Sequence, residues 1–165
     1  IPEEMGLVAR FFGKTVLSEV EPAQFYASLG SLRGKAPDRA LLRAMHFFEE
    51  NARVPRLVAA FRAGNGEAIR ELIIESGRSS AEYLQNVCPA NPNERSVALA
   101  LALSERLLRG VGAWRVHGGG FAGTIQALSP FDCLDGYVSG MEAVFGSGCC
   151  YRLSVRPVGG TRVDA

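Results

Sequence analysis

Glycines gather in one short stretch of the chain, and this stretch is the best candidate for chemistry. Four of six consecutive positions are glycine, with one histidine directly before them: His117, Gly118, Gly119, Gly120, Phe121, Ala122 and Gly123. Glycine is favoured where the backbone takes a positive φ or where another group approaches the main chain closely. Successive backbone amides in such a loop can form an anion-binding nest. The stretch therefore predicts either a tight structural turn or a loop whose amides contact a ligand.

The spacing Gly118-x-Gly120-x-x-Gly123 is formally that of a dinucleotide-binding turn, but its context argues against that function. The dinucleotide motif requires a helix directly after the glycines. Here residues 124–128 alternate and Pro130 follows them, which leaves no room for an amphipathic helix. A Walker-type phosphate loop is excluded as well, because no Gly-Lys-Ser/Thr follows. The sequence predicts a glycine loop that joins two strands.

Two histidines offer little for acid–base or nucleophilic catalysis. His46 lies among apolar residues of a predicted helix, which favours a packed side chain over a ligand contact. His117 abuts the glycines and either orders the loop or contacts a ligand. Neither a Ser-His-Asp nor a Cys-His constellation follows from two isolated histidines. We therefore predict no catalytic residue in this chain.

Other polar residues have ordinary interpretations. Arg78 and Ser79 could contact a sugar or a phosphate, although hydroxyls at this position favour helix capping. Glu49 and Glu50 are typical of a solvated helix face. The four cysteines have neither CxxC spacing nor nearby histidines, so we expect scattered reduced thiols and no metal site: Cys88, Cys133, Cys149 and Cys150.

Length and composition indicate one folded domain over residues 1–165. Hydrophobic residues make up 47% and charged residues 21% of the chain. Lysine and arginine (18) nearly balance aspartate and glutamate (17), so no global field would recruit nucleic acid or an anionic membrane. The chain has no apolar run of about 18 residues and no signal segment. We expect a cytoplasmic protein, and we expect a fragment because the chain begins without methionine.

The first half of the chain is predicted to be helical. Helices are expected over 2–12, from Pro22 until Gly30, from Asp38 to about 61, and over 67–76. Pro55 predicts a kink or break around 52–54 in the long helix, and Gly77 is expected to end the helix over 67–76. Residues 15–20 indicate a weak strand or an extended turn.

The second half predicts a small sheet that carries the glycine loop. An apolar helix over 94–108 precedes the strand that enters the loop, and the strand over 124–128 leaves it. A helix over 135–145 and an alternating strand over 149–156 follow. The expected fold class is α+β, with helices on one face of a small, mostly antiparallel, ferredoxin-like sheet.

Several segments resemble one family of enzymes. Residues 115–123, preceded by Gly112 and Ala113, resemble the third, C-terminal signature of the GHMP small-molecule kinases. The triple glycine followed by Phe121 is similar to the galactokinase form in particular. Segments 43–54, 75–80 and 154–160 extend the resemblance over nearly the whole chain.

This resemblance implies the C-terminal domain of a GHMP kinase over residues 1–165, from an enzyme that transfers the γ-phosphoryl group of ATP, with Mg²⁺, to the anomeric hydroxyl of galactose. It implies that residues 118–123 form one wall of the nucleotide and substrate cleft, with His117, Arg78 and Ser79 at its margin. The partner would be an N-terminal domain of the same polypeptide that carries the sugar-binding signature, the main phosphate loop and the catalytic base. The fragment alone is then expected to be inactive.

Two departures and one alternative remain. His117 stands where many galactokinases have Thr or Ser, and Ala122 replaces a glycine, so the sugar stays open. The alternative is a free-standing ferredoxin-like binding or regulatory module whose glycine loop senses a small anion. A reading frame that extends roughly 200 residues upstream, the size of a further domain, would favour the kinase.

Overall fold

The computed structural model describes residues 1–121, 123–155 and 158. Its elements in chain order are α1 (Pro2–Phe11), the 3₁₀ turn η1 (Leu17–Glu19), α2 (Pro22–Ala27), α3 (Leu29–Arg33), α4 (Asp38–Arg62), α5 (Gly66–Ser79), the π-helical turn η2 (Ser80–Leu84), α6 (Ser96–Leu108), β1 (Ala113–Val116), β2 (Ile125–Leu128) and α7 (Phe131–Phe145). None of the helices in this part of the chain is long and apolar enough to cross a membrane.

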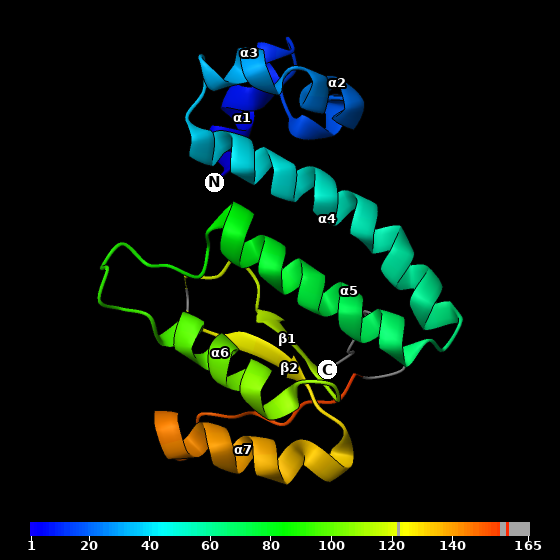
Figure 1. The fold of residues 1–165 in the computed structure, drawn as a ribbon, viewed down its shortest axis with the longest axis vertical. Coiled ribbons are helices and arrows are strands. Elements are labelled where there is room, and N and C mark those ends of the chain that lie inside the picture. The colour runs from blue at the N-terminus through cyan, green and yellow to red at the C-terminus, as the bar shows by residue number, and fades with distance from the viewer. Residues whose placement is uncertain (122, 156–157, 159–165) are drawn as a thin grey trace, which may run out of the picture.

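The three N-terminal helices pack against the first half of α4 (Figure 1). Their shared core includes Val8, Phe25 and Leu32, each without exposed surface, and the rings of Phe25 and Phe48 lie 5.0 Å apart. Pro22 begins α2, as its fixed φ favours. The expectation that Gly30 ends this helix is wrong, because α2 ends at Ala27 and Gly30 lies inside α3.

The long helix α4 is continuous through Pro55, so of the kink or break predicted around 52–54 the break is wrong. Proline removes one backbone hydrogen bond of the helix. Packing on both sides of that position compensates for the loss, because Phe48 is buried against the N-terminal helices and Arg53 and Ala60 are buried as well. Tertiary contacts thus keep the helix continuous at a position where the local sequence predicts a kink or a break.

Gly77 does not end α5, which also contradicts the sequence-based expectation. Asn65 caps the start of the helix, and its side chain accepts a hydrogen bond from the Ala68 amide at 3.1 Å. The helix continues past Gly77 to Ser79 and then through η2, which is followed by Gln85 with φ +59°. A Cβ at Gly77 would lie 2.9 Å from the Trp114 carbonyl oxygen. This glycine therefore serves the close approach of β1 to α5.

Replacing Gly77 by alanine is expected to lower the free energy of unfolding by about 1–2 kcal/mol. Overpacking against the β1 backbone costs about 1–3 kcal/mol, whereas alanine gains about 1 kcal/mol of helix propensity. A Cβ at Gly136, inside α7, would meet nothing within 4 Å, so Gly136→Ala is the matched control and should stabilise the chain by about 0.5–1 kcal/mol. Urea unfolding of both variants gives the comparison, and equal stabilisation by both would contradict the packing role of Gly77.

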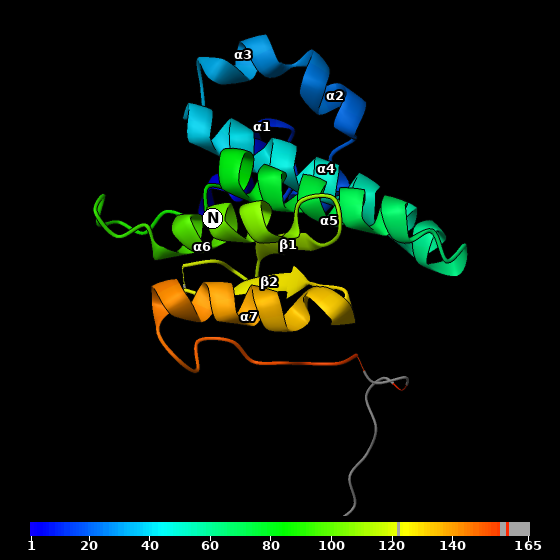
Figure 2. The same cartoon turned by 60° about the horizontal axis from the view of Figure 1, so that its bottom comes forward.

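The strands form one antiparallel hairpin, in which Ala113 pairs with Leu128 and Val116 with Ile125. Figures 1 and 2 show this hairpin between α5 on one side and α7 on the other, with α6 alongside. Trp114 belongs to the core cluster here, together with Tyr137 and Met141 of α7. The helix predicted over 135–145 begins earlier, at Phe131, directly after Pro130.

The predicted third strand over 149–156 is wrong for the described part of that segment. Residues 149–155 are in no strand, residue 156 lies outside the described residues, and the described sheet has two strands. Tyr151, Leu153 and Val155 keep the alternating pattern but are 86%, 91% and 96% exposed. Alternation alone does not supply the neighbouring strand edge that a strand needs. The chain is mostly helical with a small antiparallel sheet, and a ferredoxin-like sheet is not present in the described residues.

Candidate functional site

The glycine loop is the connection of the β1–β2 hairpin, as its sequence predicted. The His117 amide donates to the Thr124 carbonyl at 3.1 Å and closes the base of the loop. Gly118, Gly120 and Gly123 have φ of +60°, +80° and +84°, a region that favours glycine. The strand β2 follows the loop, which confirms that the dinucleotide motif lacks its helix. Ala122 lies outside the described residues.

One side of the loop is docked on Asn86, just after η2. The Phe121 amide donates to the Asn86 carbonyl oxygen at 3.0 Å. A Cβ at Gly120 would collide with that same oxygen, so only glycine fits there. Asn86 is 1% exposed. No motif marks Asn86 in the sequence, and the contact depends on how η2 brings it to the hairpin.

The tip of the loop is open. Gly119 has no positive φ, and a Cβ there would meet nothing within 4 Å. Among the described residues, no backbone hydrogen-bond partner occupies the amides of Gly118 and Gly119. Phe121 is 53% exposed beside them. This side of the loop presents free amide donors and one aromatic ring, an arrangement that can receive an anionic group.

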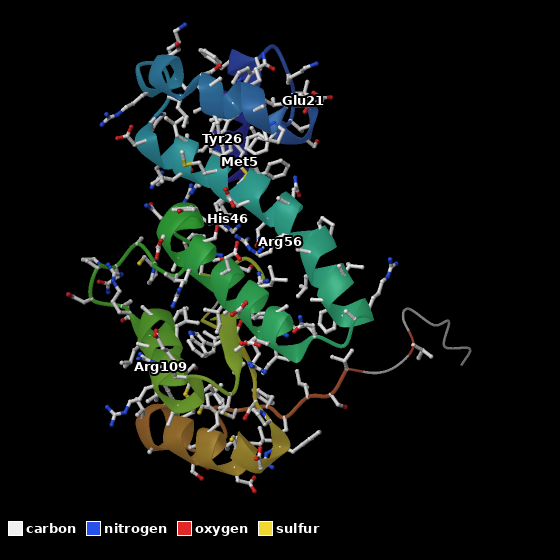
Figure 3. All side chains as sticks on the ribbon, turned by 45° about the vertical axis from the view of Figure 1, so that its right-hand side comes forward. Met5, Glu21, Tyr26, His46, Arg56 and Arg109 are labelled. Atoms are coloured by element: carbon white, nitrogen blue, oxygen red, sulfur yellow. The ribbon has the colours of Figure 1, made fainter. Side chains whose placement is uncertain are left out.

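The other predicted site residues differ in their exposure to solvent. His117 and Arg78 are exposed, whereas Ser79 is buried and its hydroxyl lies 2.9 Å from His46 Nδ1. The helix-capping interpretation of Ser79 is therefore wrong. His46 is 8% exposed and lies between α4 and α5 (Figure 3). The prediction of a packed side chain is confirmed. Arg78 and Ser79 share a cavity of about 250 Å³ with Glu49, Arg53, Glu75, Glu82 and Tyr83.

A network of charged and hydroxyl side chains connects α4, α5 and β1. The Ser76 hydroxyl donates to Glu50 Oε2 at 2.7 Å, and Arg53 contacts both Glu50 and Glu75, the latter at 3.1 Å. Arg115 of β1 reaches within 4.0 Å of Glu50 Oε2. Arg53 is 5% exposed. The interpretation of Glu50 as part of a solvated helix face is therefore wrong. Its side chain links α4 to the strand that enters the glycine loop.

The network sets the charge states of two of its neighbours. Burial lowers the pKa of His46 below its usual value, assisted by the charge of Arg53 and opposed by Glu50. For Glu50, burial raises the pKa, but the Ser76 hydrogen bond and the charges of Arg53 and Arg115 outweigh burial and hold the pKa below its usual value. His46 is therefore stable as a neutral ring and Glu50 as a carboxylate.

His46 is expected to make the chain less stable as the pH falls from 7 toward 5.5. Its folded pKa lies below the unfolded value of about 6.5, so protons bind the unfolded state more readily and the contribution is lost below that pH. His46→Asn keeps a polar group near Ser79 but does not titrate. Urea unfolding of both proteins between pH 7.5 and 5.5 gives the test. An identical pH slope in the variant would show that His46 does not carry the effect.

The chain is similar in sequence to bacterial galactokinases. No family model matches it. It is 30% identical over 133 residues to a galactokinase of Pasteurella multocida, an alignment that covers 81% of this chain and 33% of that protein. Galactokinases of Actinobacillus pleuropneumoniae serotypes 5b and 3 are each 30% identical over 128 residues, which cover 78% of this chain and 32% of theirs. The chain spans about one third of the length of these curated relatives.

Proposed function

We propose that this chain, a distant relative of bacterial galactokinases, is the C-terminal domain of a galactokinase-like enzyme that phosphorylates the anomeric hydroxyl of galactose with ATP. The observation that carries the proposal is the glycine loop: it closes a hairpin, is docked on Asn86, and presents free amides at its tip. The coverage of about one third of each relative supports a longer parent polypeptide. In this proposal the further part is N-terminal, because residues 115–123 resemble a C-terminal signature.

The loop suits phosphoryl transfer because this reaction needs little covalent work from the protein. Catalysis depends on holding donor and acceptor in line and on stabilising the charge of the transferred group. The Gly118 and Gly119 amides are fixed dipoles, since the hairpin and Asn86 position the backbone on either side of them. They would donate to the oxygens of the transferred phosphoryl group at one wall of the cleft.

The described residues offer hydrogen-bond donors for the phosphates of a nucleotide but no cluster of ligands for a metal ion. An anionic phosphate chain fits the free amides of the loop tip. For Mg²⁺, no group of three His, Cys, Asp or Glu side chains within the described residues could hold a metal ion. The ligands for Mg²⁺ would therefore come from the nucleotide and from the N-terminal part of the enzyme. The catalytic base belongs there as well in this proposal, so the 165-residue chain alone is expected to be inactive.

His117 is the loop residue that would contact the sugar side of the cleft. It is exposed, directly precedes Gly118, and its amide is held by Thr124. An imidazole there can both donate and accept a hydrogen bond. Sugar hydroxyls do the same, so His117 would contribute to the choice of hexose.

The proposal is tested with the full-length protein, Mg·ATP and a panel of hexoses that differ in one hydroxyl configuration. The expected result is ADP release with galactose well above that with glucose or mannose, and none from the 165-residue chain alone. Galactose-independent ADP release in the full-length protein would contradict a sugar kinase. The free-standing regulatory module gains no support from the fold, since the ferredoxin-like sheet on which it was based is not seen in the described residues.

A further inference from the structure

Two cysteines stand together where the chain leaves α7. Cys149 and Cys150 follow the turn 146–148, in which the Gly148 amide donates to Glu142 Oε1 at 2.9 Å. The Cys149 amide donates to the Gly146 carbonyl at 3.4 Å. The two sulfur atoms lie 3.8 Å apart. The turn thus presents two adjacent thiols in mutual contact.

The two thiols have different surroundings. Cys149 is exposed, whereas Cys150 is half-buried against the core cluster that contains Tyr137 and Met141. Burial, together with the contact to Cys149, raises the pKa of Cys150 to about 11. At neutral pH this thiol keeps its proton, and oxidation by peroxides, which requires the thiolate, is disfavoured.

A direct bond between these sulfurs is disfavoured by geometry too. Adjacent Cα atoms across a trans peptide lie about 3.8 Å apart, whereas ordinary disulfides join Cα atoms about 4.4–6.8 Å apart. A single atom inserted between the two sulfurs relaxes this constraint, because the sulfurs need not approach to bonding distance. The pair is therefore better suited to chelating a third atom than to forming a disulfide.

We propose that Cys149 and Cys150 form a dithiol site for trivalent arsenicals, in which one arsenic atom bridges both sulfurs. Soft sulfur ligands are preferred by soft, thiophilic centres, and the protonated thiols lose their protons in the binding reaction itself. With an arsenic(III) oxide reagent, two S–H bonds and the arsenic–oxygen double bond break, and two arsenic–sulfur bonds form. Both thiol protons leave with the arsenic-borne oxygen as one water molecule. Arsenic stays trivalent, and no oxidant or reductant takes part.

The other two cysteines make the site specific to this pair. Cys88 lies in the segment between η2 and α6, and Cys133 lies in the first turn of α7. Among the described residues, only Cys149 and Cys150 have a sulfur–sulfur contact. Isolated thiols bind an arsenical through one sulfur, and such single bonds exchange readily with added monothiols.

The test treats the reduced 165-residue chain with one equivalent of phenylarsine oxide. The expected result is one adduct by intact mass and the loss of two titratable thiols of the four in the chain, retained against excess of a monothiol and reversed by a small dithiol. Cys149→Ser, at an exposed position that leaves the core unchanged, should abolish the monothiol-resistant adduct, and so should Cys150→Ser. Cys88→Ser and Cys133→Ser are the matched controls and should retain it. A monothiol-resistant adduct that survives in Cys149→Ser, or the absence of any such adduct in the unchanged chain, would overturn the proposal.

Discussion

Replacing Gly119 by valine in the full-length protein is expected to lower kcat/KM for galactose phosphorylation at least about 100-fold, with no change in melting temperature. Loss of one preorganised donor to a transition-state oxygen costs about 10²–10³ in kcat, and the valine side chain would cover the amides at the loop tip. The fold should tolerate it, because Gly119 has no positive φ and a Cβ meets nothing within 4 Å. Steady-state kinetics with ATP and galactose, together with thermal unfolding, measure both effects.

Two companion variants separate the role of the loop tip from a general effect of glycine replacement. Gly34 ends α3 with φ −82° and an open Cβ position, so Gly34→Val should leave kinetics and melting temperature unchanged. Gly120→Ala should lower both activity and melting temperature, because its Cβ would collide with the Asn86 carbonyl oxygen. Undiminished activity of Gly119→Val would refute the role that we assign to the loop.

Glu50→Ala is expected to destabilise the chain by about 3 kcal/mol. Removing one partner of a buried ion pair leaves an uncompensated charge, which costs about 3–5 kcal/mol. Here that charge belongs to Arg53, at 5% exposure, while the remaining contact to Glu75 and the partial exposure of Glu50 place the cost at the low end. Ser76 also loses its acceptor. Urea unfolding of the variant and the unchanged chain gives the difference in free energy of unfolding, provided that the m-value is the same for both.

The neighbouring residue Glu49 is the matched control for this substitution. It is exposed and accepts one hydrogen bond, from the Tyr26 hydroxyl at 3.1 Å. Glu49→Ala should therefore cost about 1 kcal/mol or less. If both alanine variants lose the same free energy, the network around Arg53 is not a buried, cooperative one.

The sequence predicted the elements that depend on local pattern. The helices around Val8, Leu41 and Leu72 follow from apolar periodicity, and the hairpin follows from two short runs on either side of the glycines. The exclusion of a dinucleotide turn is also confirmed, because β2 follows Gly123 where that motif needs a helix. Pro130 and the alternation before it predict this from the sequence. The loop conformation at Gly118, Gly120 and Gly123 belongs to the same group.

The expectations that failed concern residues whose role is set by a distant neighbour. Glycine is common at helix ends, but the missing Cβ of Gly77 instead allows β1 to approach α5 closely. Serine is common at helix caps, but the hydrogen-bond partner of the Ser79 hydroxyl is His46 on another helix. The alternation after Cys150 is that of a strand, but Leu153 has no neighbouring strand among the described residues. In each case the structure depends on a contact with a distant residue, made or lacking, that the local sequence pattern does not contain.

Asn86 and Glu50 show what a single sequence does not reveal about the site. Asn86 contacts the loop through its main-chain carbonyl, an atom that every residue has, so its type carries no signal. Glu50 became important because Ser76 and Arg53 meet it across a helix interface. The family resemblance, in contrast, could be seen from the residues, and the similarity to galactokinases over about four fifths of the chain agrees with it.

If this chain forms one wall of the active site of a galactose 1-kinase, the product of the full-length enzyme must carry its phosphate on the anomeric carbon. Phosphorus NMR of the reaction of Mg·ATP with galactose distinguishes that product from one phosphorylated on the primary hydroxyl. We expect galactose 1-phosphate as the only sugar phosphate, formed by the unchanged protein and formed at least about 100-fold more slowly by Gly119→Val. A 6-phosphate product, or no sugar phosphate from the unchanged full-length protein, would show that the proposed function is wrong.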